Sequence, residues 1–384
     1  MSGRIRPMAD GRMRQAALAC IGRLGALWCD SIGAGSPSGA LADIATAFTQ
    51  ADMSNRIWVV EAQTKVAASG RAPMSSAVAT WFRGVGTFER PLLYLLHSPA
   101  LRDVLVAGAE ATGLHGPREP SPARRGIFLN DANLTLRDRR ARVRPELPLW
   151  LAAQTDWLPY DPASAQELKA LLCAALDALY VRGESGFCYL SAHDVPCPDA
   201  SPLGPADASD AFRGMYRLHT LPQTHPPYVM RLCGAGRALA SVREAARWLQ
   251  LDWGVASEVW SCPSYTRLAR EAGVAAHRAM LGGAPIVDNA HLMRCLTQRT
   301  AAPNAPVLAV TGYARHIADQ IGAFVPARFA ALGCDDLDVR ADDISPGEAP
   351  GVRWIVLNSL RLLADDGVFA RTRLAEATRR YGLA

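Results

Sequence analysis

One carboxylate stands out among the side chains that could do acid–base chemistry. Glu61 directly follows the apolar run Ile57 to Val60, and this pattern predicts a buried strand that ends at the glutamate. In open α/β sheets the ligand crevice lies at the carboxyl ends of the strands, so we expect Glu61 at the rim of such a crevice. On position alone, a solvated carboxylate or a turn cap remains the simpler interpretation.

Two other patterns have both a chemical and a structural interpretation. Gly234-Ala235-Gly236 lies between an expected strand and an expected helix, where a dinucleotide-binding fingerprint would lie, but Leu239 replaces its third glycine. A tight strand-to-helix turn explains these glycines equally well. The arginines within 137–144 could hold a phosphate, although an arginine run in a Pro-rich segment is more often a solvated loop.

Common catalytic and metal-binding motifs are missing from the sequence. It contains no G-x-x-x-x-G-K-[ST], no G-x-S-x-G and no H-E-x-x-H, and its eight histidines show no metal-ligand spacing. A Ser/His/Asp triad is neither indicated nor excluded. The nine cysteines are scattered without any C-x-x-C pair, so we expect reduced thiols and no zinc site.

The composition is that of a folded cytoplasmic protein. The chain has 384 residues, 49% hydrophobic and 20% charged, which is enough for two or three domains. A net charge of +5 is mild for this length and does not predict a nucleic-acid partner. No apolar stretch is long enough to span a bilayer, and Arg23 interrupts the apolar run from 16 to 28, which argues against a signal peptide. A first amphipathic helix is the preferred interpretation of that run, and an Arg-rich presequence is the alternative.

Helical and strand patterns alternate along the first half. We expect a helix over 38–51, strands at 57–60, 103–108 and 187–190, and a helix that opens at Asp161-Pro162 and buries apolar side chains between 168 and 179. Residues 116–147, rich in Pro and Arg, are predicted as an irregular exposed excursion apart from the apolar 126–129.

The second half repeats the alternation after a Pro-rich stretch. We expect strands at 228–233, 258–261, 285–287 and 307–310, and helices around 242–249, 351–365 and 368–380. The predicted fold is α/β with two domains, each a mostly parallel sheet flanked by helices. The predicted limits are a tail at 1–15, a first domain at 16–193, a linker at 194–212 and a second domain at 213–384.

The second half resembles a known family. The segments that carry the resemblance are Gly-Met-Tyr-Arg-Leu at 214–218, Val-Met-Arg-Leu-Cys-Gly-Ala-Gly-Arg-Ala-Leu at 229–239, Asp-Trp-Gly-Val-Ala-Ser-Glu-Val-Trp-Ser at 252–261, Ser-Tyr-Thr-Arg-Leu-Ala-Arg-Glu at 264–271, and Ala-Pro-Val-Leu-Ala-Val-Thr-Gly-Tyr at 305–313. In sequence and order they resemble the C-terminal domain of the decarboxylating component of the homodimeric bacterial pyruvate dehydrogenase complex, in the transketolase superfamily. About 170 residues are covered.

The first half is similar to the pyrimidine-binding domain of the same family. Residues 56–64 look like the strand that delivers the family's thiamine-activating glutamate, and the match falls on Glu61. Thr112 to His115 lies where the family has a histidine-rich substrate loop, here reduced to His115. Phe88 is the nearest candidate for the aromatic residue that stacks on the aminopyrimidine.

The resemblance implies thiamine diphosphate chemistry, with Glu61 hydrogen-bonded to the aminopyrimidine in an apolar crevice that raises its pKa. The family's diphosphate- and Mg²⁺-binding domain, with its Gly-Asp-Gly motif, has no counterpart here, since the chain contains no Gly-Asp pair. The resemblance therefore predicts a β-type subunit, in a dimer or heterotetramer, that shares the cofactor with a partner subunit holding the diphosphate and Mg²⁺. The two-carbon unit of a 2-oxo acid or ketose would pass to a lipoyl, carrier-protein or sugar acceptor. The alternative is a non-catalytic scaffold or regulatory subunit.

Overall fold

The computed structural model describes residues 11–27, 35–61, 90–97, 100–113, 125–131, 146–197, 202–221, 226–282, 285, 289–335 and 350–383. The chain divides into two units. The first comprises Met1–Tyr160 and Leu168–Asp194, and the second comprises Asp161–Glu167 and Val195–Ala384.

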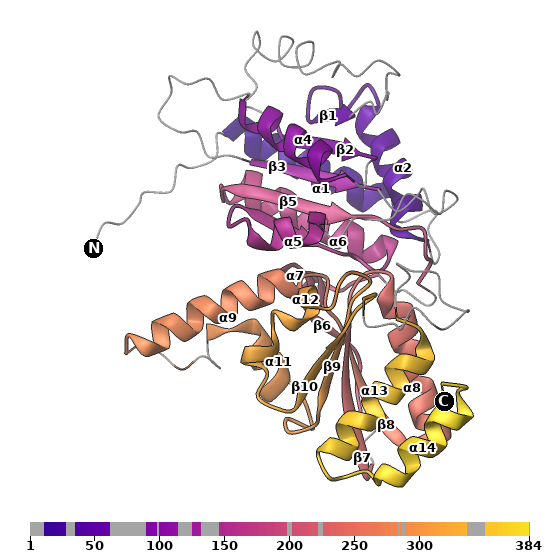
Figure 1. The fold of residues 1–384 in the computed structure, drawn as a ribbon. Helices are drawn as coiled ribbons and strands as arrows, with labels where there is room; N and C mark the ends of the chain where they lie inside the picture. Colours follow the sequence, from indigo (N-terminus) through magenta and orange to yellow (C-terminus); the bar gives the residue numbers. More distant parts are fainter. Residues whose placement is uncertain are drawn as a thin grey trace. The chain divides into compact units, whose positions relative to one another are not determined.

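The first unit is built on a parallel sheet (Figure 1). Its strands are β1 (Trp58–Glu61), β2 (Leu92–Leu96), β3 (Arg125–Asn130), β4 (Trp157–Tyr160) and β5 (Gly186–Ser191), in the order β1-β2-β3-β5-β4. Every neighbouring pair runs parallel. All the strands therefore end at the same edge, and polar residues that follow different strands are brought together there.

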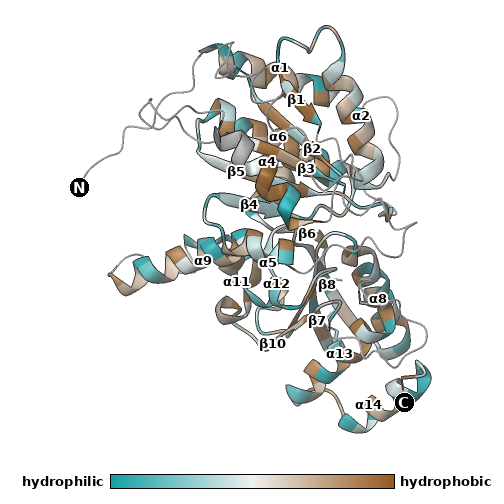
Figure 2. Ribbon diagram, turned by 45° about the horizontal axis from the view of Figure 1, so that its top comes forward, coloured by the Kyte–Doolittle hydropathy of each residue, from teal (hydrophilic) through white to brown (hydrophobic). Residues whose placement is uncertain are grey.

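Helices pack against this sheet because its strands are apolar on both faces (Figure 2). The helices are α1 (Gly11–Leu27), α2 (Pro37–Thr49), α4 (Leu101–Gly113), α5 (Glu146–Ala153) and α6 (Ala165–Leu176), the last continued by the π-helical turn η3 (Asp177–Val181). On one face, Tyr94, Phe128 and Trp157 pack with Val104 of α4 and Leu151 of α5.

The second unit contains a sheet of five strands with one antiparallel edge. These are β6 (Tyr216–His219), β7 (Tyr228–Gly234), β8 (Val255–Ser261), β9 (Val307–Val310) and β10 (Phe329–Leu332), in the order β10-β9-β7-β8-β6. Only β6 runs against its neighbour among these described strands.

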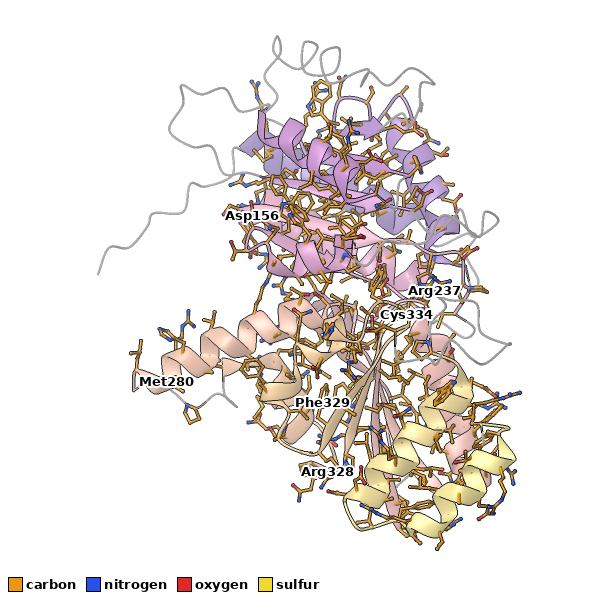
Figure 3. The ribbon with its side chains drawn as sticks, in the orientation of Figure 1. Asp156, Arg237, Met280, Arg328, Phe329 and Cys334 are labelled. Carbon is orange, nitrogen blue, oxygen red and sulfur yellow. The ribbon has the colours of Figure 1, made fainter. Side chains whose placement is uncertain are left out.

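Two groups of helices form separate cores with this second sheet. Side chains of α8 (Ala238–Trp253), α13 (Val352–Asp365) and α14 (Arg371–Arg380) share one core, and those of α9 (Tyr265–Met280), α11 (His291–Thr297) and α12 (His316–Asp319) share another. The helix α7 (Pro205–Arg213) and the 3₁₀ turn η4 (Gly322–Phe324) complete the unit. Met280 lies at the free end of α9, with 84% of its surface exposed (Figure 3).

The predicted α/β class with two mostly parallel sheets is confirmed, and most predicted elements lie close to their expected ranges. The prediction of a strand at 103–108 is wrong, because these residues belong to helix α4. In that helix Val104 and Ala107 are buried while Leu105 and Val106 are exposed, a helical spacing that a short apolar run does not reveal. The neighbouring strand is β2, which the sequence analysis did not identify.

Two segments predicted as irregular contain regular structure. Within 116–147, residues Arg125–Asn130 form β3, the central strand of the first sheet, and α5 begins at Glu146. Within the predicted linker 194–212, Pro205 starts α7, which ends at Arg213 and is capped by Gly214 with a positive φ of 116°. Proline at the first helical position and glycine just after the last are ordinary helix boundaries, so their presence does not by itself indicate a linker.

The predicted helix start at Asp161-Pro162 is also wrong. Helix α6 begins at Ala165, and the hydroxyl of Ser164 caps it by accepting the amide of Glu167. The amide of Asp161 instead donates to the carbonyl of Pro263, within the second unit. The predicted strand at 285–287 falls largely outside the described residues.

Among the described residues, none of the helices combines the length and the apolar character needed to cross a membrane.

Candidate functional site

Three polar side chains lie together at the carboxyl edge of the first sheet. Glu61 is the last residue of β1, His97 directly follows β2 and Asp131 directly follows β3. These strands are adjacent, with Glu61 in register with Leu95 and Leu96 in register with Asn130. The parallel arrangement therefore places Glu61, His97 and Asp131 side by side.

His97 bridges the two carboxylates. Its Nδ1 lies 2.5 Å from Oδ1 of Asp131, and its Nε2 lies 3.3 Å from Oε1 of Glu61. The Asp131 side chain is only 3% exposed, and its amide donates to the carbonyl of Leu96, which fixes its position. The side chain of Glu61 is 66% exposed. The group is thus anchored at Asp131 and open at Glu61.

The surroundings favour the protonated imidazole. The pKa of His97 is raised above 6.5, chiefly by its hydrogen bond to Asp131, with help from the negative charges of Asp131 and Glu61 and against the effect of burial. A protonated imidazole donates from both ring nitrogens. His97 can therefore donate one hydrogen bond to Asp131 and the other to Glu61.

Buried hydrogen bonds support this edge of the sheet. The amide nitrogen Nδ2 of Asn130 donates to the Tyr189 hydroxyl at 2.8 Å, and both side chains are buried. The backbone amide of Ser38, near the start of α2, donates to the carbonyl of His193. These contacts tie the ends of β3 and β5 and the segment after β5 to the body of the unit.

The predicted site residues differ in where they fall. Glu61 lies at a strand end as predicted, whereas Phe88 and His115 are outside the described residues, as is the arginine run 137–144. The apolar crevice expected around Glu61 is not formed by the described residues, since the carboxylate is largely exposed and faces an imidazole. His97 and Asp131 were missed. The signal for His97 was a polar residue directly after an apolar run, and Asp131 follows the run 127–129 after one intervening residue, Asn130.

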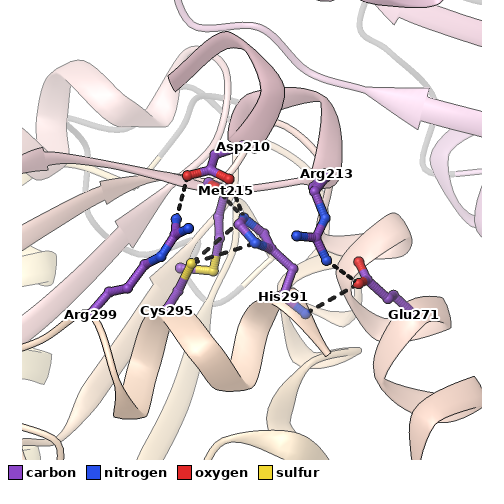
Figure 4. Close-up of polar contacts among 7 residues, drawn as sticks. All are labelled: Asp210, Arg213, Met215, Glu271, His291, Cys295 and Arg299. Carbon is purple, nitrogen blue, oxygen red and sulfur yellow. Dashed lines mark hydrogen bonds and ion pairs between the residues drawn. The ribbon is translucent and has the colours of Figure 1, made fainter. Parts of the chain in front are cut away.

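A second polar cluster, in the second unit, resembles a nucleophile–base arrangement (Figure 4). The Sγ of Cys295 lies 3.6 Å from Nε2 of His291, and that nitrogen also bonds the carbonyl of Met215 at 2.8 Å. The flanking ion pairs join Asp210 to Arg299 and Arg213 to Glu271.

This second cluster is structural. Cys295 and His291 are fully buried, and burial raises the pKa of the Cys295 thiol to about 12 and is the main cause of the lowered pKa of His291. A thiol that stays protonated and has no access to solvent is not a nucleophile. The cluster instead joins α7, α9 and α11.

The turn Gly234-Ala235-Gly236 also has a structural explanation. The Gly236 amide donates to the Asp161 carbonyl at 2.9 Å, and φ of Gly236 is +49°. A Cβ on Gly236 would lie 2.1 Å from the Asp161 carboxylate. The glycine therefore permits a close approach of the chain at Asp161, which favours the structural interpretation of this turn.

Within the part of the chain that the structure describes, no group of three or more His, Cys, Asp and Glu side chains is arranged to hold a metal ion.

Comparisons with known proteins agree with the resemblance in the sequence. No family model matches the chain. It is 31% identical over 236 residues, 60% of its length, to the pyruvate dehydrogenase E1 component of Cupriavidus necator. It is also 31% identical over 232 residues, 59% of its length, to that of Haemophilus influenzae. The chain covers only about a quarter of these relatives, 26% and 25% of their lengths.

Solved structures agree in fold. A transketolase from Campylobacter jejuni aligns with 91% of this chain and 50% of its own, with a TM-score of 0.52 and 12% identity. A split-gene transketolase, described as an inactive β4 tetramer, aligns with 93% of this chain and 98% of its own at a TM-score of 0.49 and 14% identity. The chain is therefore a homologue of pyruvate dehydrogenase E1 components and has a transketolase-like α/β fold.

Proposed function

We propose that this chain is a cytoplasmic β-type subunit of a thiamine diphosphate-dependent enzyme. It would help to transfer a two-carbon unit from a 2-oxo acid or a ketose to a lipoyl, carrier-protein or sugar acceptor. The observation that carries the proposal is the exposed Glu61 carboxylate, held by His97 at the carboxyl edge of β1 in a homologue of E1 components.

The residues at this edge fit the pyrimidine end of the cofactor. The Glu61 carboxyl group is accessible and can share a hydrogen bond with a ring nitrogen, which is the contact that the resemblance implies. The diphosphate motif that the resemblance implies finds no counterpart, because the sequence has no Gly-Asp pair. We therefore assign the diphosphate and Mg²⁺ to a partner subunit, in a dimer or heterotetramer.

Each residue at this edge has a distinct proposed role. Thiamine diphosphate, when bound, supplies the carbanion chemistry. Glu61 exchanges a proton with the pyrimidine ring nitrogen, while His97 orients its carboxylate and carries a second proton beside it. Asp131 fixes the imidazole. Phe88 and His115 lie outside the described residues; from the resemblance alone, Phe88 remains the proposed stacking residue and His115 the proposed contact to the substrate.

Reconstitution with a partner tests the proposal. The lone chain is expected to bind thiamine diphosphate weakly in calorimetry with Mg²⁺, because the diphosphate and its metal provide most of the charge-based attraction. The chain together with a subunit that carries the Gly-Asp-Gly motif should bind the cofactor and consume a 2-oxo acid or ketose. A micromolar one-to-one complex with the lone chain would overturn the two-subunit proposal.

A non-catalytic scaffold or regulatory subunit is the second candidate. It is favoured by one observation, the pairing of Glu61 with His97 in place of the apolar surroundings that an activating glutamate requires. This candidate predicts that the pair assembles and that the partner's activity does not depend on Glu61.

A further inference from the structure

A pocket of about 680 Å³ lies entirely within the second unit, between helix α8 and the edge strand β6. Every residue that lines it belongs to Asp161–Glu167 or to the chain after Val195. None of its lining residues belongs to the buried cluster of Figure 4. Its lining combines apolar side chains with basic ones, and this combination indicates what could bind there.

The apolar part of the lining comes from α8 and β8. Leu239, Ala246 and Leu251 lie on the side of α8 that faces the pocket, and Val259 of β8 lines it as well. Leu251 is 78% exposed, so a ligand in the pocket could still cover it. This wall would bury apolar surface if a ligand with an apolar body occupied the pocket.

A β-bulge turns a histidine toward the same side. Arg217 pairs with Trp260 and His219 pairs with Val259, so Leu218 is the extra residue between them. Because paired residues share a face of the sheet, His219 joins the face of Val259. Arg217 also lines the pocket, but its guanidinium reaches Glu258 at 3.6 Å and lies over the Trp260 ring. The bulge thus adds an imidazole to the lining.

Two arginines of α8 give the pocket its positive charge. Arg243 donates to the sulfur of Cys197 at 3.6 Å, and Arg247 pairs with Glu244 at 3.0 Å on the exposed surface. Asp207 is the acidic residue in the lining. The lining therefore carries more positive than negative charge.

A buried hydroxyl adds an independent observation. Ser257 lines the pocket, is only 6% exposed, and its Oγ has no hydrogen-bond partner among the residues that the structure describes. Its neighbours on the same face of β8, Val255 and Val259, are core residues. Burying a hydroxyl without a partner is unfavourable, and an acceptor on a ligand that reaches it would satisfy it.

We propose that this pocket binds a small amphipathic anion, a molecule with a carboxylate or phosphate headgroup and an apolar body. The headgroup contacts Arg243 and Ser257, with His219 and Arg247 at the rim, and the body lies against Leu239, Ala246 and Leu251. The proposal does not depend on the thiamine-dependent function, because every group it uses lies in the second unit.

Calorimetry on the full chain with four probes tests the proposal. Octanoate and octyl phosphate are expected to bind, and the tighter of the two identifies the headgroup. Octanol lacks the charge and inorganic phosphate lacks the apolar body, so each should bind at least about tenfold more weakly than the better amphiphile. Octanol binding as tightly as both anions would overturn the proposal, and so would no binding by either anion.

Variants locate the binding. Arg243→Gln should weaken the better anion about tenfold or more, and Ser257→Ala should weaken it without lowering the melting temperature. The matched control is Arg328→Gln, which removes an arginine just before β10, at the opposite edge of the same sheet (Figure 3). Ala246→Trp, which fills the pocket and keeps every charge, should abolish binding and serves if Arg243→Gln does not fold. Unchanged affinity in a folded Arg243→Gln or Ala246→Trp chain would contradict the assignment.

Discussion

In the first unit, polar side chains gather at the carboxyl edge of the sheet, where Glu61 is 66% and His97 33% exposed. In the second unit, Arg231, Glu167 and His291 are completely buried. Each of these buried groups makes hydrogen bonds inside its own unit. A glutamate and a histidine are therefore accessible to solvent in the first unit, whereas the glutamate and the histidine named in the second unit contact only protein.

The difference separates groups that can act on a ligand from groups that hold the fold. A buried charge is tolerated when its bonds are satisfied, and using it for chemistry would break those bonds. An exposed carboxylate beside an imidazole can still bond a ligand. For this reason we place the reaction at Glu61 and His97, although the second unit contains a closer match to a Cys–His pair.

The largest effect on stability is expected from Arg231→Met. The Arg231 guanidinium donates to the carbonyls of Leu296, Pro303 and Ala305, and the variant would remove this donor from all three, including the buried Leu296 and Ala305. We expect a loss of about 3 kcal/mol or more in the free energy of unfolding, measured by urea denaturation. Arg328→Gln, which changes an exposed arginine, is the control. If both variants lose only about 0.5 kcal/mol in the free energy of unfolding, Arg231 does not have the structural role described.

A smaller, pH-dependent effect is expected from Glu167→Gln. Glu167 accepts the Ser261 hydroxyl at 2.6 Å and the Ala163 amide at 2.5 Å, and burial is the main reason that its pKa is raised above 4.5. Since the folded pKa of this acid is raised, the wild-type chain loses stability as pH rises above about 4.5 toward that pKa. Glutamine cannot ionise. Above the folded pKa, the free energy of unfolding of the variant should therefore rise relative to wild type by about 1.4 kcal/mol for each unit by which the pKa of Glu167 is raised. A difference that is flat from pH 4 to pH 8 would exclude this account.

The smallest effect is expected from His97→Gln, because His97 is partly exposed. Its folded pKa is raised, so its contribution to stability is fully present below about 6.5 and is lost as pH rises through the folded pKa. We expect the free energy of unfolding of the variant to fall by less than about 1 kcal/mol at pH 6 and to be unchanged at high pH. NMR titration of the imidazole provides the direct check: Asp131→Asn should lower the pKa more than Glu61→Gln does. The reverse order would show that Asp131 is not the anchor.

The sequence predicted the parts of this fold that depend on local pattern. The apolar run before Glu61 and the helical period between 168 and 179 were read correctly, because burial on one side leaves a visible spacing. The quoted family segments predicted the second domain as a transketolase-like sheet. Glu61 was predicted as a candidate site residue from its position at the end of a strand together with the local resemblance to the family.

The rest depended on contacts between distant residues. His97 and Asp131 become neighbours only because β2 lies between β1 and β3, and neither β2 nor the full β3 was identified. Arg231 lies within a segment that resembles the family, but the carbonyl groups that accept its hydrogen bonds lie 65 to 74 residues further along the chain. A sequence pattern indicates burial along one element, whereas these roles follow from the order of strands and the path of loops.

The central claim is that Glu61 acts on the cofactor, and turnover by the reconstituted pair with Glu61→Gln tests it most directly. Glutamine keeps the volume and one acceptor but cannot exchange a proton, so donor consumption should fall by about a hundred- to ten-thousand-fold. The melting curve and assembly should be unchanged, since Glu61 is a largely exposed carboxylate. Glu146→Gln, which changes another exposed glutamate of the first unit, should keep full turnover. If Glu61→Gln retains more than about a third of wild-type turnover, far above what loss of an acid–base group leaves, Glu61 is not the activating residue.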